Sequence, residues 1–311
     1  KDSEMAQATY AVVIVTYNRE LLLRECIRHV KAQTVPAAKV IIVNNASTDG
    51  TSAYLKELSE NQDVCQIIEC SENIGGAGGF ARGIAHALKY DTDYVLIIDD
   101  DAMLSADYME KLLQAREKNP EYRAFAGSVM TDGAVDTWHR RMLSRIGLLF
   151  ENCPASMYQS SSFPCDIVSF CGMVVDTAVI RKVGLPHAEY FIWNDDAEYS
   201  LRILKYSRFL VVPGAVLDHR TTAQKTGSRP RRYEWRDYYA VRNRLLLVKE
   251  HGSIPDKIVN YTNLFIHVIF RNRLFQVLQK DHYDWAYENG LVRQAIHDAA
   301  TSKHRTDNTT G

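Results

Sequence analysis

The chain has 311 residues, of which 46% are hydrophobic and 24% are charged, and this composition is typical of a globular protein with one large core or one core and a smaller appendage. Its 37 basic and 38 acidic residues give a formal net charge of -1, which argues against nucleic acid as a partner. Six cysteines without a CxxC pair indicate neither a zinc site nor a disulfide framework, so reduced thiols of a cytosolic protein are expected.

The N-terminal part of the chain alternates strand and helix patterns. Continuous apolar runs predict four strands that are covered on both faces, at 11–15, 40–43, 66–69 and 94–98. Helices are expected between them, over 20–32, from near Thr51 and over 79–90. This alternation predicts an α/β fold with a mostly parallel central sheet and helices on both faces. Ligands of such sheets bind beyond the carboxyl ends of the strands, which is where the polar clusters of this sequence fall.

The pattern loosens after residue 101. A helix is expected over 106–118, and further strands are expected over 125–130, 167–175 and 209–212. Residues 131–166, which include Trp138 and several arginines, are interpreted as a substrate-facing insertion. The chain becomes helical, basic and aromatic from Tyr233. We therefore expect a catalytic domain over 1–230 and a helical C-terminal region over 231–311.

Three consecutive aspartates, Asp99, Asp100 and Asp101, follow the strand predicted at 94–98. Carboxylates this close repel one another unless a cation lies among them. Alternate residues of an extended segment project to the same side, so Asp99 and Asp101 could bind one Mg2+ or Mn2+ that keeps positions open for phosphate oxygens. His219, after the strand predicted at 209–212 and a Pro-Gly turn, could complete this metal site. The alternatives are a solvated acidic turn or helix N-cap, and an ordinary surface or core histidine.

Glycines dominate the segment Gly75-Gly76-Ala77-Gly78-Gly79, ahead of Arg82. They would allow a ligand to approach the backbone, and the helix predicted after them would offer its positive N-terminus to an anion. The spacing matches neither G-x-G-x-x-G nor the Walker A motif, which argues against a Rossmann dehydrogenase and a P-loop NTPase. A flexible turn is the alternative.

Two adjacent acids, Asp195 and Asp196, follow an aromatic run that ends in Trp193. Apolar surroundings raise the pKa of a carboxyl group toward the range that suits a general base, although such a pair can also be a helix N-cap. Glu198 and Arg202 are four residues apart and are interpreted as a helix-stabilising pair.

Taken in this order, the motifs resemble the family 2 glycosyltransferases, which have the GT-A fold. The resemblance runs from Val12 to about Arg220, roughly two thirds of the chain. It rests on six segments: Val13-Ile-Val-Thr-Tyr-Asn-Arg19, Val43-Asn-Asn-Ala-Ser-Thr-Asp-Gly-Thr51, Asn73-Ile-Gly-Gly-Ala-Gly-Gly-Phe-Ala-Arg82, Asp99-Asp-Asp101, Asp195-Asp196 and His219. Within the family, Asn73–Arg82 and Trp193–Tyr199 look most similar to bacterial galactofuranosyltransferases, and bacterial rhamnosyltransferases share much of the pattern.

The resemblance implies a nucleotide site and a metal site. Nucleotide-binding residues would be Thr16, Tyr17, Arg19, Asn45, Gly76, Arg82, Asp99 and Asp100. The family often has an aspartate near Asn45, and this departure leaves the identity of the base open. Asp99, Asp101 and His219 would hold Mn2+ or Mg2+ against the donor diphosphate.

The resemblance also implies an inverting transfer. Asp196 would be the general base that takes a proton from an acceptor hydroxyl, and a single in-line displacement would invert the anomeric configuration. Asp195 would assist at this catalytic site, while Trp193 and Trp138 would contact the acceptor. The implied donor is UDP-galactofuranose or dTDP-rhamnose, and the implied acceptor is a glycan or glycolipid of a bacterial cell envelope.

Location and further partners are expectations from composition. No stretch reaches the ~18 apolar residues of a membrane span, and the polar N-terminus does not resemble a signal peptide, so a cytoplasmic location is expected. The apolar segment Ile258–Phe270 and the basic, aromatic segment before it could lie on the inner face of the cell membrane. They could equally pack on the catalytic domain or join two copies in a homo-oligomer.

Two other classes of function stay open at this point. A nucleotidyltransferase would normally carry a Gly-rich, basic phosphate loop after its first strand, where this chain has Thr16–Arg19. A catalytically inactive sugar-binding or scaffold protein of the same fold is opposed by the presence of Asp99, Asp101, Asp196 and His219.

Overall fold

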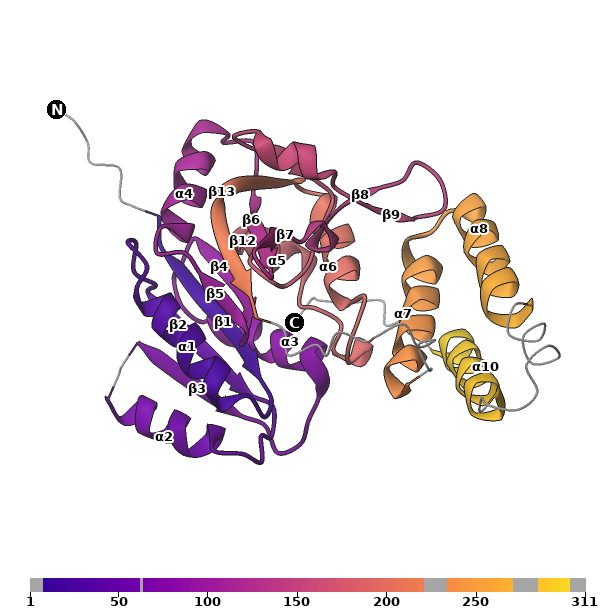
Figure 1. Cartoon of the computed structure of the whole chain (residues 1–311), viewed down its shortest axis with the longest axis horizontal. Helices are drawn as coiled ribbons and strands as arrows, with labels where there is room; N and C mark the ends of the chain where they lie inside the picture. The colour runs from indigo at the N-terminus through magenta and orange to yellow at the C-terminus, as the bar shows by residue number, and fades with distance from the viewer. Residues whose placement is uncertain (1–7, 62–63, 221–233, 271–284, 303–311) are drawn as a thin grey trace. The chain divides into compact units, whose positions relative to one another are not determined.

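The computed structural model describes residues 8–61, 64–220, 234–270 and 285–302 (Figure 1). These residues form two compact units. The first comprises the chain up to Met142, Phe150–Phe191 and the described residues from Asp195 to 220. The second comprises Leu143–Leu149, Ile192–Asn194 and the C-terminal helices. The domain boundary predicted between residues 230 and 231 lies outside the described residues.

A 10-stranded mixed sheet forms the centre of the first unit, with the path β10-β13-β6-β12-β4-β1-β2-β3. Its strands are β1 (Tyr10–Thr16), β2 (Lys39–Asn44), β3 (Cys65–Glu69), β4 (Tyr94–Asp99), β5 (Ala102–Leu104), β6 (Ala124–Thr131), β7 (Ala134–Val135), β10 (Phe163–Cys165), β12 (Met173–Asp176) and β13 (Phe209–His219). Strands β4, β1, β2 and β3 run parallel, as the buried apolar runs predict. β12 lies antiparallel between β4 and β6, while β13 runs parallel to β6.

Helices cover both faces of this sheet, which confirms the predicted α/β architecture (Figure 1). They are α1 (Glu20–Lys31), α2 (Thr51–Asn61), α3 (Gly75–Ala87), α4 (Tyr108–Lys118), α5 (Thr177–Val183) and α6 (Asp195–Leu204). Successive side chains of a strand point to opposite faces, so Val12 and Ile14 of β1 join the core under α1, α2 and α4. Val13 and Val15 join the core under α3, α5 and α6.

The glycine segment belongs to a helix rather than to a loop. α3 begins at Gly75, four residues earlier than predicted, and includes all four glycines. The reason is packing, because a Cβ atom at Gly79 would lie 2.6 Å from Cγ1 of Val15, and one at Gly83 would collide with Val13. The glycines therefore let α3 approach β1 closely.

Two predicted strands differ from the structure. The single strand expected over 167–175 is two strands in different sheets, β11 (Ile167–Val168) and β12, separated by a turn in which Gly172 has a φ of +87°. The Pro-Gly turn expected after residue 212 is a bulge inside β13, where the register with β6 shifts between Val212 and Val216.

The insertion predicted over 131–166 contains a small sheet. β11 pairs with β8 (Arg140–Leu143), which pairs with β9 (Phe150–Asn152). Short 3-10 helices accompany this region, η1 (Thr137–His139), η2 (Ala155–Gln159) and, further along, η3 (Ala188–Tyr190). The insertion is tied to the central sheet at both ends, because β7 pairs with β6 and β10 pairs with β13.

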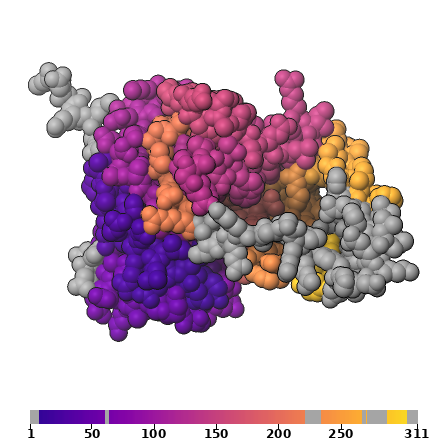
Figure 2. Space-filling view, viewed as in Figure 1, coloured from indigo at the N-terminus to yellow at the C-terminus, as the bar shows by residue number. Residues whose placement is uncertain are grey.

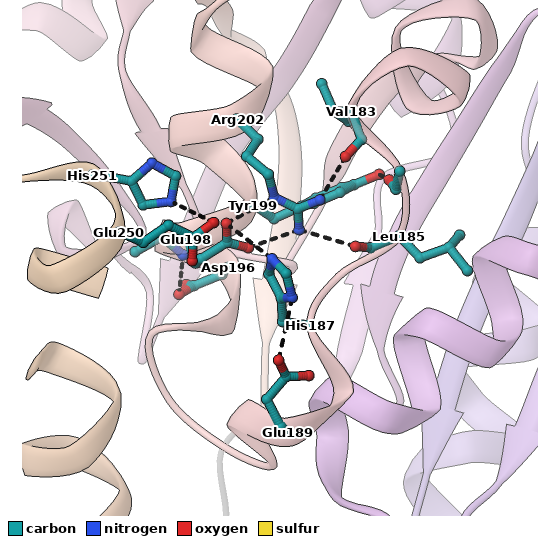
Figure 3. A network of polar contacts seen from close by, with 12 residues as sticks. Val183, Leu185, His187, Glu189, Asp196, Glu198, Tyr199, Arg202, Glu250 and His251 are labelled. Carbon is teal, nitrogen blue, oxygen red and sulfur yellow. Dashed lines mark hydrogen bonds and ion pairs between the residues drawn. The ribbon is translucent and has the colours of Figure 1, made fainter. Parts of the chain in front are cut away.

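A buried ion pair between Glu198 and Arg202 stabilises helix α6. Nε and one terminal nitrogen of Arg202 each donate to Glu198 at 2.7 Å, and the guanidinium also donates to the carbonyl oxygens of Val183 (2.6 Å) and Leu185 (2.9 Å) (Figure 3). The i,i+4 pair predicted from the sequence is therefore present, and it is buried.

The second unit is helical, as predicted. Its helices are α7 (Trp235–His251), α8 (Ile254–Leu264), the π-helical segment η4 (Phe265–Phe270) and α10 (Trp285–Thr301). The hydroxyl of Tyr238 on α7 donates to Asp298 on α10 at 2.6 Å. Capping boxes formed by Glu234 with Asp237 and by Ser253 with Asp256 begin α7 and α8. Among the described helices, none has the length and apolar character needed to cross a membrane.

Candidate active site

The acidic cluster lies where β4 ends. Asp99 is the last residue of β4, while Asp100 and Asp101 turn the chain into β5. β5 pairs with the end of β13 and sets Ala102 opposite His219. Nε2 of His219 consequently lies 3.3 Å from Oδ1 of Asp101. In the space-filling view, orange residues at the end of β13 lie against indigo residues from the N-terminal part of the chain (Figure 2).

Residues at the end of β1 contact the same aspartates. The hydroxyl of Thr16 donates to Asp100 at 2.7 Å. Arg19 donates to Asp101 at 2.6 Å and to Asp100 at 3.2 Å. The guanidinium of Arg19 thus partly neutralises the acidic cluster, and its predicted contact with the nucleoside stays a prediction.

Burial and mutual repulsion shift the pKa values of these carboxyl groups. Burial, and then the charges of Asp101 and Asp100, raise the pKa of Asp99 to about 7. Burial raises the pKa of Asp100 to about 6 against the opposing effect of Arg19. Burial also acts to raise the pKa of Asp101, but His219 and Arg19 together hold it below the usual value.

The donor set fits a divalent cation. Asp99 and Asp101 supply the carboxylate oxygens that Mg2+ and Mn2+ favour, and His219 supplies an imidazole nitrogen. Nδ1 of His219 is buried and has no hydrogen-bond partner among the described residues. A cation would stabilise the ionised form of Asp99. The residues present are therefore compatible with the predicted metal site.

His139 lies beside this site and was missed by the sequence reasoning. Its ring centroid is 5.0 Å from that of His219, in an edge-on arrangement. Its Nδ1 is 2.8 Å from the hydroxyl of Ser169, and its Nε2 is 3.6 Å from Asp136. Burial, and then Arg140, lower the pKa of His139 to about 3, so the ring is neutral. The dense cationic sequence Trp138-His139-Arg140-Arg141 was the available signal.

The second carboxylate pair begins helix α6. Asp195 is buried, and burial, followed by the charges of Asp196 and Asp99, raises its pKa well above the usual value. Because the charge of Asp99 acts on Asp195, the structure brings the two acidic motifs into one electrostatic environment although 96 positions separate them (195 minus 99). Burial also raises the pKa of Asp196, while the cation of Arg141 opposes this shift.

The predicted nucleoside residues differ in their exposure to solvent. Tyr17 and Arg82 are exposed, and Arg82 donates to Sγ of Cys70 at 3.4 Å. The amide of Asn45 is buried and donates to Asn73 and to the carbonyl of Gly75, both at 2.9 Å. Asn45 therefore helps to hold the start of α3 in place, and its predicted contact with the nucleoside stays a prediction.

The N-terminus of α3 is partly occupied by the chain itself. The backbone N–H of Ala77 donates to the carbonyl of Phe191 at 3.1 Å. Gly75 has a φ of +76°, and a Cβ atom at this position would collide with the same carbonyl. Gly76 keeps more room, because a Cβ atom there would lie 4.0 Å from its nearest neighbour. An anion at this helix N-terminus would therefore have less space and fewer free N–H groups than the glycine-rich sequence suggests.

The two predicted acceptor residues belong to different units. Trp138, in the first unit, is 52% exposed, and the guanidinium carbon of Arg141 lies 4.9 Å from its ring centroid. Trp193, in the second unit, has a φ of +65°, and its carbonyl accepts a hydrogen bond of 2.8 Å from Asn243. The roles of both tryptophans toward an acceptor stay predictions.

Comparisons with known proteins identify the family. The sequence profile described as "Glycosyl transferase family 2" matches residues 11–180, more than half of the chain. Galactofuranosyltransferase GlfT1 of Mycobacterium tuberculosis is 28% identical over 207 residues, which cover 65% of this chain and 66% of that protein, slightly less than two thirds. The dTDP-rhamnosyl transferase RfbF of Shigella flexneri is 26% identical over 245 residues, which cover 77% of this chain and 79% of RfbF.

Solved structures agree on the fold. The crystal structure of GalNAc-T7 with UDP, GalNAc and Mn2+ superimposes with a TM-score of 0.67 at 12% identity, and the match covers 95% of this chain and 58% of GalNAc-T7. The sheet, the order of the motifs and the family profile lead to the same conclusion. The chain belongs to glycosyltransferase family 2 and has the GT-A fold.

Proposed function

We propose that this enzyme is an inverting hexosyltransferase that moves galactofuranose from UDP-galactofuranose to a hydroxyl group of a cell-surface glycan or lipid-linked acceptor. The similarity to GlfT1 supports the donor. The observation that carries the mechanism is the cluster at the end of β4, where pairing of β5 with β13 places Nε2 of His219 3.3 Å from Oδ1 of Asp101 beside Asp99.

At the donor end, Asp99, Asp101 and His219 would hold Mn2+ or Mg2+. Such an ion, when bound, offsets the negative charge of the departing nucleoside diphosphate. Arg19 supplies a positive charge beside Asp100 and Asp101, and Thr16 orients Asp100. The proposed contacts with the nucleotide are Thr16, Tyr17, Arg19, Asn45, Gly76, Arg82, Asp99 and Asp100.

At the acceptor end, Asp196 is the general base. It takes the proton of the acceptor hydroxyl as that oxygen forms a bond to the anomeric carbon and the bond from this carbon to the diphosphate oxygen breaks. Attack from the face opposite the leaving group inverts the anomeric configuration. The raised pKa of Asp196 makes it a stronger base than an exposed aspartate, and Trp138 and Trp193 are the proposed acceptor contacts.

dTDP-rhamnose is the second candidate donor. The specific observation in its favour is that the similarity to RfbF extends over 77% of this chain, compared with 65% for GlfT1. The change of donor would alter the nucleotide and sugar contacts and leave the roles of Asp196 and the metal-binding residues unchanged.

We also propose that the enzyme works at the inner face of the cell membrane and that its C-terminal helices contact the lipid surface, with residues 1–230 forming the catalytic domain and 231–311 the helical region. The support is a row of exposed apolar side chains on α8 and η4. A homo-oligomer formed through the same surface is the competing proposal.

Calorimetric titration with UDP, dTDP and GDP, each with and without Mn2+, tests the donor site. We expect UDP binding that requires Mn2+ and weakens at least about tenfold in Asp101→Ala, since removal even of a residue that supports a metal ligand costs about 10- to 100-fold. Asp91→Ala, which removes an exposed aspartate elsewhere, is the control and should bind as the wild type does. Preference for dTDP would favour rhamnosyl transfer, while metal-independent binding, or no binding of any of the three, would contradict the proposed site.

A further inference from the structure

Helix α6 carries two carboxylate–arginine pairs, and they differ in kind. The Glu198–Arg202 pair is closed, with two contacts of 2.7 Å and further hydrogen bonds from the guanidinium to backbone carbonyls (Figure 3). The Asp196–Arg141 pair is open, because the nearest nitrogen of Arg141 lies 3.6 Å from Oδ2 of Asp196, beyond hydrogen-bond distance. The first pair is suited to stabilising the helix. In the second, Oδ1 of Asp196 accepts a hydrogen bond of 2.6 Å from the N–H of Ala197, and Oδ2 is the oxygen that faces Arg141 without a hydrogen bond to it.

Arg141 is nevertheless held firmly. Its backbone is fixed in the small sheet, where it lies opposite Ile167 and where its carbonyl accepts hydrogen bonds from N–H of Asp166 (3.2 Å) and Sγ of Cys165 (3.1 Å). Its guanidinium carbon lies 4.9 Å from the ring centroid of Trp138 and 5.2 Å from that of Phe150. Two aromatic rings thus lie within cation–π distance of a side chain that is only 9% exposed.

The adjacent Arg140 differs from Arg141, because its guanidinium is fully engaged in hydrogen bonds to the backbone. Successive residues of a strand point to opposite faces, and Arg140 points away from Arg141. Its guanidinium donates to three backbone carbonyls at 2.9 Å, those of Gly127, His139 and Cys171. In contrast, the buried Nε of Arg141 has no hydrogen-bond partner within the described parts of the chain. A buried donor without a partner costs stability, so this nitrogen does not hold the fold together by hydrogen bonds as the guanidinium of Arg140 does.

We propose that Arg141 is a positioning residue that links the carboxylate of Asp196 to the exposed indole of Trp138, so that an acceptor sugar bound on this ring presents its hydroxyl to Asp196. The inference rests on the proposed role of Asp196 as the general base. An aromatic face beside polar groups is suited to the apolar face and hydroxyl rim of a sugar ring. The same cation favours the ionised form of Asp196, in which the carboxylate can accept a proton.

The charges around Asp196 make this proposal measurable. Arg141 and Arg140 of β8 lower its pKa, as do the N–H groups at the start of α6, and burial raises it. The adjacent Asp195, with its own raised pKa, is the other acid next to it. Removal of the Arg141 charge should therefore raise the pKa of Asp196 further.

The experiment compares Arg141→Gln and Arg141→Lys with Arg145→Gln, which removes an exposed arginine four positions further along. The pKa of Asp196 is followed by NMR of the enzyme labelled with 13C at the aspartate carboxyl carbon, with Asp196→Asn as the assignment control. We expect an upward shift in Arg141→Gln, no shift in Arg145→Gln, and a value near that of the wild type in Arg141→Lys, which retains the charge.

Transfer kinetics supply the second readout. With UDP-galactofuranose as donor and octyl β-galactofuranoside as acceptor, kcat/KM for the acceptor should fall about 100-fold in Arg141→Gln, the size of loss that misplacement of a catalytic group produces. Arg141→Lys should remain impaired because an ammonium group lacks the planar fork of a guanidinium. Calorimetric affinity for UDP with Mn2+ should not change in either variant.

The variants of the buried Arg141 could fail to fold, so Trp138→Leu provides an independent test. Trp138 is 52% exposed, and its replacement should not affect folding. It should raise KM for the acceptor while UDP affinity is retained. An unchanged pKa of Asp196 in Arg141→Gln, or equal losses of UDP affinity and transfer, would overturn the inference about Arg141. Failure of the proposed function would give a different result. Either Asp196→Asn would keep full transfer activity, or the wild type would transfer neither galactofuranose nor rhamnose. In both cases the upward pKa shift of Asp196 in Arg141→Gln would still be present.

Discussion

At the scale of single residues, Asp195 and Asp196 are neighbours with different expected protonation. Burial and two neighbouring carboxylates raise the pKa of Asp195 well above its usual value, which favours its protonated form. Asp196 has Arg141 beside it and is expected to supply the ionised carboxylate. When two acids lie this close, their environments set different roles for them.

Amide substitutions should separate these roles. Asp196→Asn should lower kcat by about 100- to 10,000-fold, the range attributed to a general base. Asp195→Asn gives an amide of the same shape as the protonated acid, the form that the raised pKa favours, and should retain activity within about tenfold because it leaves a hydrogen-bond donor in place. Steady-state kinetics with UDP titration as the control checks both. If Asp195→Asn were the more damaging variant, the assignment of the base to Asp196 would be wrong.

The pH profile depends on the same residue. A general base must be deprotonated, and the pKa of Asp196 lies above the usual aspartate value of about 3.9. kcat/KM for the acceptor should therefore be complete above this raised pKa and be lost as the pH falls through it. Affinity for UDP and Mn2+, measured at each pH, shows how much of the loss comes from the metal ligands. An acid limb at the pKa of an exposed aspartate would contradict the role of Asp196.

At the scale of elements, the contact of α3 with β1 depends on glycines that carry no side chain into the interface. A Cβ atom at Gly83 would collide with Cγ1 of Val13 and lie 3.1 Å from Cγ2 of Val43, both in the strands beneath the helix. Val13 and Val43 are fully buried, so the clash cannot be relieved by moving a flexible side chain into solvent. The position of β1, whose end carries Thr16, thus depends on how closely α3 packs against it.

Two glycine-to-alanine variants of α3 should have opposite effects. Gly83→Ala should lower the free energy of unfolding by about 1–3 kcal/mol through overpacking. Gly76→Ala has space around its Cβ and should be neutral or stabilise by up to about 1 kcal/mol, because alanine is the better helix former. Urea denaturation measures both changes. Equal destabilisation by the two variants would show that packing against β1 is not the reason for the glycines.

At the scale of the whole molecule, the described part of α8 and the segment after it present an apolar row to solvent. Ile254, Ile258, Tyr261 and Phe265 are between 49% and 75% exposed and recur at helical spacing. Exposed rows of this kind often mark a surface that binds a membrane or another protein.

The proposed membrane contact predicts binding to lipid vesicles. The enzyme should co-sediment with phosphatidylglycerol-containing vesicles, and Ile258→Glu with Phe265→Glu should weaken this binding by at least about tenfold, since each large apolar side chain contributes about 1.5–3 kcal/mol when buried. Leu21→Glu, which changes an apolar side chain of α1 that is 81% exposed, should have no effect. Concentration-dependent dimerisation that the double variant abolishes, without vesicle binding, would favour the homo-oligomer instead.

The sequence by itself determined the local structure and the chemistry of the motifs. Buried apolar runs predicted β1, β2, β3 and β4, because a strand covered on both faces has no polar alternation. The acidic residues fell at strand ends for the same reason, since carboxylates cannot be accommodated within such strands. The order of these motifs along the chain was sufficient to indicate the family.

Only the tertiary structure decided which side chains meet. Pairing of β5 with β13 brings His219 to Asp101, and the small sheet of the insertion brings Arg141 to Asp196. Hydrophobic periodicity likewise did not predict the hydrogen bonds of Asn45 to Asn73 and Gly75. Nor did it predict that the strand expected over 167–175 is divided between two sheets. The physical reason is that hydrophobic spacing reports which face of an element is buried, whereas contacts between distant segments depend on how the elements pack and on where the turns between them lead.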